Sequence, residues 1–278
     1  MKIVIPSYRR PDNVLALNDV SPELQKKYYV LVVRENEHYH YKENYPHPEY
    51  WLIPNDTDGI RETRQHINER MSGKIMVIDD DTAFRRTFPK PCLSCKEKGK
   101  PQVNWARYTK ENTSDVLEEM IEYLEPLMDE YYFGTVRSLS IQARIFEKVT
   151  PYSLNKPCFR AVFFNLDHFD SEKYNYMDGP EMLEDIYISV KYFHDGHDIP
   201  SVGKFGVEGL AKVGSQKGGC SNPNRSKLHN QSCMELEELY PQYITAIKSE
   251  TLSRAEHLDN NMLSVRCKFK RQRTMKLF

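Results

Sequence analysis

The sequence lacks the features that would assign it to a membrane, to secretion or to a strongly charged partner. No apolar run approaches the roughly 20 residues that a helix needs to cross a bilayer, and the apolar part of the N-terminus is too short for a signal peptide. Without export, the six cysteines are expected to be reduced. The formal net charge is −1, so global charge indicates no partner. We therefore expect a cytoplasmic protein without membrane contact.

The first 80 residues alternate strand, loop and helix patterns. Apolar runs predict strands over residues 2–5, 28–33, 51–54 and 75–78, and a helix is expected over 60–71. This alternation predicts βαβ units with right-handed crossovers and a mostly parallel sheet flanked by helices. The expected fold class is α/β, in a chain of 278 residues that is long enough for a sizeable core.

Helix and strand patterns continue downstream. Helices are expected over 113–132, capped by Thr113 or Ser114, and over 234–252, with strands over 134–140 and 161–165.

Three consecutive carboxylates, Asp79, Asp80 and Asp81, follow the apolar run 75–78 directly. In open α/β sheets, ligands bind at the carboxyl ends of the strands. Crowded carboxylates repel one another, and Mn²⁺ or Mg²⁺ would relieve this repulsion while completing its shell with substrate phosphates. The alternative interpretation is an acidic, solvated loop after a core strand.

The loop that follows the first strand offers a hydroxyl, an aromatic ring and guanidiniums, at Ser7, Tyr8, Arg9 and Arg10. These groups suit a nucleotide and its phosphates. The third strand ends in a second polar loop, 55–59. Because both loops are predicted at the same sheet edge as the aspartates, a metal–diphosphate site is favoured over a solvated loop.

A second acidic cluster, 178–185, precedes a predicted helix. Acidic residues in a first turn are stabilised by the helix dipole, by about 0.3–1 kcal/mol each, which is a sufficient structural explanation. The functional alternative is a carboxylate that serves as a general base for the acceptor.

Three segments have unusual compositions. Residues 85–110 are basic and are expected to form an insertion loop, in which Cys92 and Cys95 lack a second cysteine pair for zinc. Residues 203–224 hold six of the twelve glycines and are interpreted as a lid. The basic tail 266–276 is either a solvated terminus or a contact to a phosphate backbone. We expect a catalytic core over 1–200 and a lid, helix and tail over 201–278.

The motifs IPSYRRP, NDTDGI, DDD and LED together resemble those of GT-A-type (Rossmann-like) nucleotide-sugar glycosyltransferases, over residues 1 to about 190. Within that group the chain resembles the phage-encoded, TET-associated DNA glycosyltransferases. The resemblance implies a single GT-A domain that uses Mn²⁺ or Mg²⁺ and a UDP-sugar. The implied acceptor is a hydroxymethylated base in DNA, foremost 5-hydroxymethylcytosine, and the implied mechanism is inverting.

The resemblance also implies site residues. Those expected to bind the nucleotide sugar are Pro6, Ser7, Tyr8, Arg10, Asp58, Arg64, Asp79 and Asp80. Asp81 would bind the metal directly, Asp79 would contact metal or ribose, and His229 would join only if the C-terminal loop folds back. Asp185, or Glu184 beside it, would be the general base.

Two alternatives remain at this stage. A GT-A-like nucleotidyltransferase, or a glycosyltransferase acting on a glycan or small molecule, would show no affinity for DNA. A non-enzymatic nucleic-acid-binding protein would bind nucleoside diphosphates without a metal requirement, if at all.

Overall fold

The computed structural model describes residues 1–91, 104–138, 144–145, 152–211, 224–249 and 262–270. Its centre is a sheet with the order β3-β2-β1-β4-β10-β7-β11-β5-β6-β8, and β9 pairs with β11. The strands are β1 (Lys2–Pro6), β2 (Tyr29–Arg34), β3 (Glu49–Ile53), β4 (Lys74–Ile78), β5 (Thr82–Pro91), β6 (Asn104–Tyr108), β7 (Phe133–Ser138), β8 (Arg144–Ile145), β9 (Tyr152–Leu154), β10 (Ala161–Asn165) and β11 (Pro200–Gly209). A separate two-stranded sheet joins β12 (Ile244–Lys248) and β13 (Leu263–Cys267).

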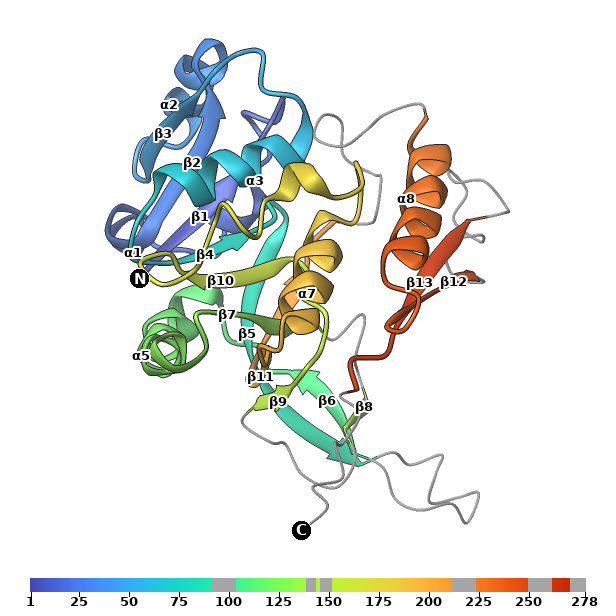
Figure 1. Ribbon diagram of the computed structural model, residues 1–278. Helices are drawn as coiled ribbons and strands as arrows, with labels where there is room; N and C mark the ends of the chain where they lie inside the picture. The colour runs from blue at the N-terminus through green and yellow to red at the C-terminus, as the bar shows by residue number, and fades with distance from the viewer. Residues whose placement is uncertain (92–103, 139–143, 146–151, 212–223, 250–261, 271–278) are drawn as a thin grey trace.

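Helices cover both faces of the central sheet (Figure 1). They are α1 (Pro22–Tyr28), α2 (His38–Asn44), α3 (Gly59–Arg70), α5 (Thr113–Tyr131), α7 (Glu184–His194) and α8 (Arg225–Leu239), with the 3-10 turns η1 (Leu15–Leu17), η2 (Glu35–Glu37) and η3 (Tyr176–Asp178). No helix in the described ranges is long and apolar enough to cross a bilayer.

The strand directions confirm the predicted α/β class. β1 pairs in parallel with β2 and β4, and β2 pairs in parallel with β3. β10 is antiparallel to both β4 and β7, whereas β11 is parallel to β7. From β3 to β11, therefore, only β10 reverses the common direction.

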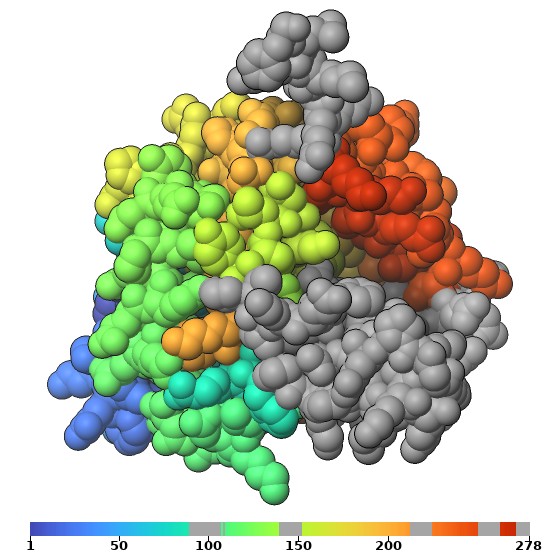
Figure 2. All heavy atoms as spheres, turned by 90° about the horizontal axis from the view of Figure 1, so that it is seen from below, coloured from blue at the N-terminus to red at the C-terminus, as the bar shows by residue number. Residues whose placement is uncertain are grey.

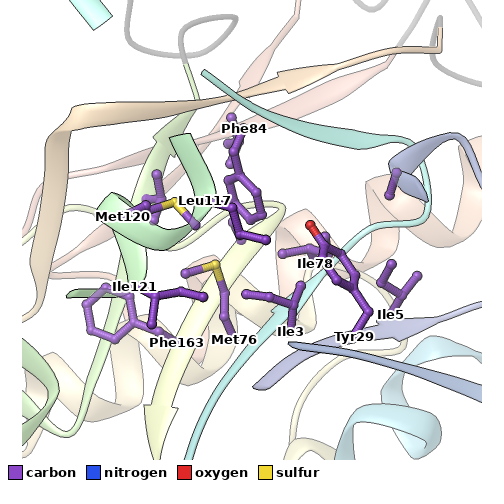
Figure 3. Close-up of a cluster of buried hydrophobic side chains, with 14 of the residues drawn as sticks. Ile3, Ile5, Tyr29, Met76, Ile78, Phe84, Leu117, Met120, Ile121 and Phe163 are labelled. Carbon is purple, nitrogen blue, oxygen red and sulfur yellow. The ribbon is translucent and has the colours of Figure 1, made fainter. Parts of the chain in front are cut away.

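Alternation along the strands divides the core between the two faces. On one face, Ile3 and Phe163 point toward Leu117 and Met120 of α5 (Figure 3). On the other face, the intervening residues of the same strands pack against α3, α7 and α8, as Val77 does in the cluster that contains Ile67, Ile188 and Leu236. The apolar spacing along α5 produces this fit, although its N-cap is Asn112 and the helix continues through Pro126.

The C-terminal elements lie beside the second helical layer. α8 packs against both β12 and β13. In the view from below, these segments (orange to red) occupy one margin of the molecule, and the N-terminal segments (blue) lie at the opposite corner (Figure 2). The carboxyl ends of β1 and β4 are neighbours where the order 3-2-1-4 changes direction, which is the position at which α/β sheets bind ligands.

Several expectations about the outer segments were wrong. The basic segment 85–110, which was expected to be a loop, contains most of β5 and all of β6, and Cys92 and Cys95 lie outside the described residues. The helix expected over 234–252 ends at Leu239 and is followed by β12. β13 takes in the start of the basic tail, whose residues from 271 onward are not described.

The glycine-rich segment is also partly a strand rather than a lid. Gly203, Gly206 and Gly209 lie in β11, where the pairing register with β7 shifts between Val202 and Gly206. Such a bulge suits glycine and explains why this strand has a weak sequence signal. The rest of the expected lid, residues 212–223, lies outside the described residues.

We predict that Gly134→Ala destabilises the sheet. An added Cβ would lie 2.4 Å from the Phe163 ring and 2.7 Å from the Pro200 carbonyl oxygen, so neighbouring strands would have to shift. Overpacking of this kind lowers the free energy of unfolding by about 1–3 kcal/mol, measurable by urea denaturation. The control Leu52→Ala, at an exposed position of β3, should change it by at most about 0.5 kcal/mol. Equal stability of parent and Gly134→Ala would contradict the packing described.

Candidate active site

Asp80 joins the ends of β1 and β4. Its Oδ1 accepts a hydrogen bond from Arg10 Nη1 at 2.7 Å, and its Oδ2 accepts one from Ser7 Oγ at 2.9 Å. The Ser7 hydroxyl also lies 3.0 Å from the Tyr41 hydroxyl, which accepts from the Arg10 backbone N–H at 3.0 Å. Burial raises the pKa of Asp80, and Arg10 and Ser7 oppose that rise. Both carboxylate oxygens are thus engaged by the chain itself.

Asp79 belongs to a second cluster, centred on the buried Arg64 of α3. Arg64 Nη2 lies 3.4 Å from Asp79 Oδ1, and Nη1 lies 3.3 Å from Glu184 Oε1 and 3.9 Å from Asp185 Oδ2. The side chain of Arg64 is only 5% exposed, and its Nε and Nη1 have no hydrogen-bond partner. One guanidinium therefore faces three carboxylates from two distant parts of the sequence.

Asp185 is a carboxyl group of this cluster whose ionisation is disfavoured by its surroundings. Burial, and secondly the neighbouring Glu184 carboxylate, raise the pKa of Asp185 to about 7, against the opposing effect of Arg64. Leu183, the N-cap of α7, adopts a left-handed conformation with φ of 65°. Strained backbone of this kind is common at functional sites. Here it begins a helix whose first two residues both face Arg64.

Asp81 has a third arginine beside it. Nη1 of Arg160, the residue before β10, lies 3.5 Å from Asp81 Oδ1. Because β10 is antiparallel, its amino end lies at the same sheet edge as the carboxyl end of β4, and the Asp79 backbone N–H donates to the Arg160 carbonyl at 3.1 Å. Burial and the nearby Asp79 raise the pKa of Asp81.

The residues present fit a divalent cation at Asp79 and Asp81. Arg160 Nη1 approaches the Asp81 carboxylate no closer than 3.5 Å, and the Asp79 side chain is 38% exposed. In the described part of the chain, no three His, Cys, Asp or Glu side chains are grouped to hold a metal. Two carboxylates with phosphate oxygens from a substrate are nevertheless a common magnesium-site composition.

The remaining predicted residues are placed around this edge or away from it. The Arg34 guanidinium lies 3.5 Å from the Tyr8 ring centroid, and its Nη2 donates to the Thr57 carbonyl. Asp58 is the N-cap of α3 and is exposed. His229, in α8, has its Nε2 at 3.2 Å from the Leu263 carbonyl oxygen, in the packing against β13. The structure thus joins Ser7, Arg10 and the aspartates but engages His229 elsewhere.

A polar pocket of about 260 Å³ lies one helical turn from the Arg64 cluster. Arg61 lines it and donates from Nη1 to the Gly179 carbonyl at 2.7 Å. Because Arg61 and Arg64 are three residues apart, they lie on the same side of α3. The other polar lining groups come from the segment before α7 and from α8: Glu181, Gln231, Ser232 and Glu235.

Sequence reasoning missed Arg160 and Tyr41. Strand-end logic considered only residues that follow a strand, whereas Arg160 precedes one. Arg160 directly precedes the apolar run AVFF. If the reversed direction of that strand had been known, a basic residue at this position would have been placed at the same sheet edge as the aspartates. Tyr41 lies in a Tyr- and His-rich stretch, residues 39–50, to which sequence reasoning assigned no site residue, and its side chain is buried.

We predict that Asp185→Asn stabilises the protein at high pH. The pKa of Asp185 is about 7 in the folded chain and roughly 3.9 in an unfolded one. Ionisation of Asp185 therefore costs stability above pH 7, and this cost disappears as the pH falls toward 4. Tm should rise at pH 8, on the order of a few degrees, with a smaller gain at pH 5.

Thermal unfolding of parent and variant at both pH values measures this difference. Glu122→Gln, on the exposed outer side of α5, is the control and should leave Tm nearly unchanged at each pH. A lower Tm for Asp185→Asn at pH 8 would mean that its charge is needed to hold Arg64.

The chain resembles known proteins in sequence and in backbone arrangement. The chain is 29% identical over 248 residues to "Beta-glucosyl-HMC-alpha-glucosyl-transferase" of Enterobacteria phage T2, covering 87% of this chain and 82% of the relative. Similar solved structures include a UDP-glucose pyrophosphorylase complexed with UDP-glucose (TM-score 0.39, 9% identity, 76% of this chain and 94% of that one). Another is S. aureus TarS (TM-score 0.40, 10% identity, 85% and 40%).

The sequence profile of the family described as TET-Associated Glycosyltransferase matches residues 1–218. This match covers most of the chain, including all three aspartates, Arg64, Arg160 and Asp185. It confirms the resemblance drawn from the strand-end motifs, and the chain belongs to the TET-associated glycosyltransferase family.

Proposed function

We propose that the protein transfers a sugar from a UDP-sugar to a hydroxymethylated base in phage DNA, most favourably 5-hydroxymethylcytosine, in a GT-A-type, inverting, metal-dependent reaction. The observation that carries this proposal is the Arg64 cluster, which links a strand-end aspartate to a carboxyl group with a pKa of about 7. Family membership supports sugar transfer, and the name of the phage T2 relative supports a hydroxymethylcytosine-containing acceptor.

The donor site is assigned to the carboxyl ends of β1 and β4. Pro6, Ser7 and Tyr8 would border the nucleoside, and Asp58 would reach the base or ribose from the end of β3. Asp80 would hold Ser7 and Arg10 in place rather than touch the donor, because both of its oxygens are already engaged.

Asp79 and Asp81 would hold Mn²⁺ or Mg²⁺, which, when bound, supplies positive charge to the departing diphosphate. The surrounding guanidiniums of Arg10 and Arg64 add to the positive potential where negative charge develops. His229 would contribute only if the C-terminal segment rearranged, because its ring now lies against β13.

Asp185 would remove the proton from the acceptor hydroxyl. A general base works best with a pKa near the operating pH, and the environment of Asp185 supplies such a value. Its side chain is 15% exposed compared with 9% for Glu184, so Asp185 is the more accessible of the two. An inverting transfer requires one general base and no covalent intermediate, and Asp185 would fill that role. A base in duplex DNA would also have to leave the stack, at a cost of a few kcal/mol.

The relative favours a second acceptor for this chain. Its name includes beta-glucosyl-HMC, which supports transfer onto a sugar that is already attached to hydroxymethylcytosine. The polar pocket lined by Arg61, Gln231 and Glu235 offers hydrogen-bonding groups suited to such a ring. The non-enzymatic alternative is not supported by the family assignment.

We predict a new nucleoside when hydroxymethylated DNA is incubated with the protein, Mn²⁺ and a panel of UDP-sugars. Digestion and mass spectrometry should show 5-hydroxymethyl-2′-deoxycytidine enlarged by one sugar residue. Asp185→Asn should lower kcat by about 10²–10⁴-fold while retaining donor affinity, and the parent's kcat/KM should fall as the pH drops below 7. Glu122→Gln is the control and should retain full turnover.

The acceptor arms of this assay separate the candidates. A product formed only on previously glucosylated DNA would select the second acceptor. Transfer to a free glycan but to neither DNA would reject the DNA assignment, and full turnover of Asp185→Asn would reject that residue as the base.

We predict that Asp81→Asn weakens UDP binding in the presence of Mn²⁺ by at least about tenfold, the scale of one lost charge-assisted interaction. Without Mn²⁺, the variant and the parent should differ much less. Calorimetric titration with and without the metal measures both constants, with Glu122→Gln as the matched carboxylate control. Equal Mn²⁺-dependent affinity in Asp81→Asn and the parent would remove the metal site from Asp81.

A further inference from the structure

The guanidinium of Arg160 has an ion-pair partner in Asp81, but its Nη1 makes no hydrogen bond. Its side chain is 21% exposed, and its Nη1 is buried without a hydrogen-bond partner. The nearest carboxylate, Asp81, lies at 3.5 Å and accepts no hydrogen bond from that nitrogen. Leaving a buried charged donor unpaired is costly, so the position favours an additional anion.

The backbone holds Arg160 at this place. Arg160 adopts a left-handed conformation with φ of 60°, and its carbonyl accepts from the Asp79 N–H. The end of β11 lies against the guanidinium, since a Cβ added to Gly209 would be 2.3 Å from Nη1. Beyond Gly209, the Leu210 N–H donates to the Asp81 carbonyl at 2.7 Å. Gly209 therefore makes room for the arginine beside the aspartate.

Two cations cannot both occupy the Asp81 carboxylate without repulsion. A divalent ion bound there would lie next to the guanidinium. Because partly buried charges are screened less than exposed ones, the repulsion between the two cations would be strong. An anion that contacts both cations removes the conflict. A diphosphate has the charge and the oxygen atoms to do so.

We propose that Arg160 forms a phosphate subsite for the donor. When a divalent cation binds Asp81, the Arg160 guanidinium leaves that carboxylate and pairs with the diphosphate instead. This inference rests on the proposed function and adds Arg160, which sequence reasoning missed, to the residues that contact the diphosphate. Arg160 weakens binding of the cation alone, yet strengthens binding of the nucleotide in its presence. The cation and the nucleotide are thereby coupled, each raising the affinity for the other.

Arg160→Met tests this exchange, because it removes the charge and retains an unbranched side chain. Mn²⁺ binding without nucleotide, followed by electron paramagnetic resonance, should tighten by about tenfold, and UDP binding in saturating Mn²⁺, followed by calorimetry, should weaken by about tenfold. Gly209→Ala, which displaces the guanidinium, should change both constants in the same two directions. Arg86→Met is the control and should change neither, since Arg86 pairs with Glu111 and Glu119.

The exchange predicts opposite changes in Arg160→Met, namely tighter Mn²⁺ binding and weaker UDP binding. A loss of affinity for both Mn²⁺ and UDP, or no change in either, would overturn the exchange. The parent separately tests the proposed function: if it binds UDP with equal affinity with and without Mn²⁺, the metal-dependent donor site fails, whatever Arg160 does. Circular dichroism and Tm of each variant establish that the measured chain is folded.

Discussion

The structure depends on compensation of charge at the point where β4 leaves the sheet. Three adjacent carboxylates emerge there, and each is met by an arginine from a different part of the chain: Arg10 after β1, Arg64 in α3 and Arg160 before β10. Only the Arg10 pair is a close hydrogen-bonded one. The distances of 2.7, 3.4 and 3.5 Å distinguish Asp80, which is held by hydrogen bonds within the fold, from Asp79 and Asp81, which we propose as the metal-binding pair.

The N-terminal half of the fold could be predicted because its signals are local. Apolar runs marked β1, β2 and β4, and helical spacing marked α5, since a strand buried on both faces and an amphipathic helix differ in period. The reversed direction of β10 could not be predicted, because pairing direction is decided by contacts distant in sequence. β11 was missed because its glycines, which suit a bulge and close packing against Arg160, resemble those of a flexible loop.

The candidate site was predictable to a similar extent. Strand-end reasoning brought Ser7, Arg10 and the aspartates to one edge, and the structure places them together. It could not predict that Asp80, rather than Asp79 or Asp81, accepts the hydrogen bonds from Ser7 and Arg10. Which of three adjacent carboxylates finds which partner depends on side-chain rotamers and loop geometry. The pKa of Asp185 likewise depends on burial against α3, which no local pattern reveals.

Arg64 has an evolutionary consequence. Its planar guanidinium lies close to carboxylates from two segments about 100 positions apart in the sequence, and the single ammonium group of a lysine cannot reproduce that geometry. A lineage that loses this guanidinium would leave three neighbouring carboxylates, two of them largely buried, without this counterion, so viable descendants must also neutralise one of them. Substitutions at positions 64, 79, 184 and 185 should therefore be correlated among homologues, so that the charge balance of the cluster is kept.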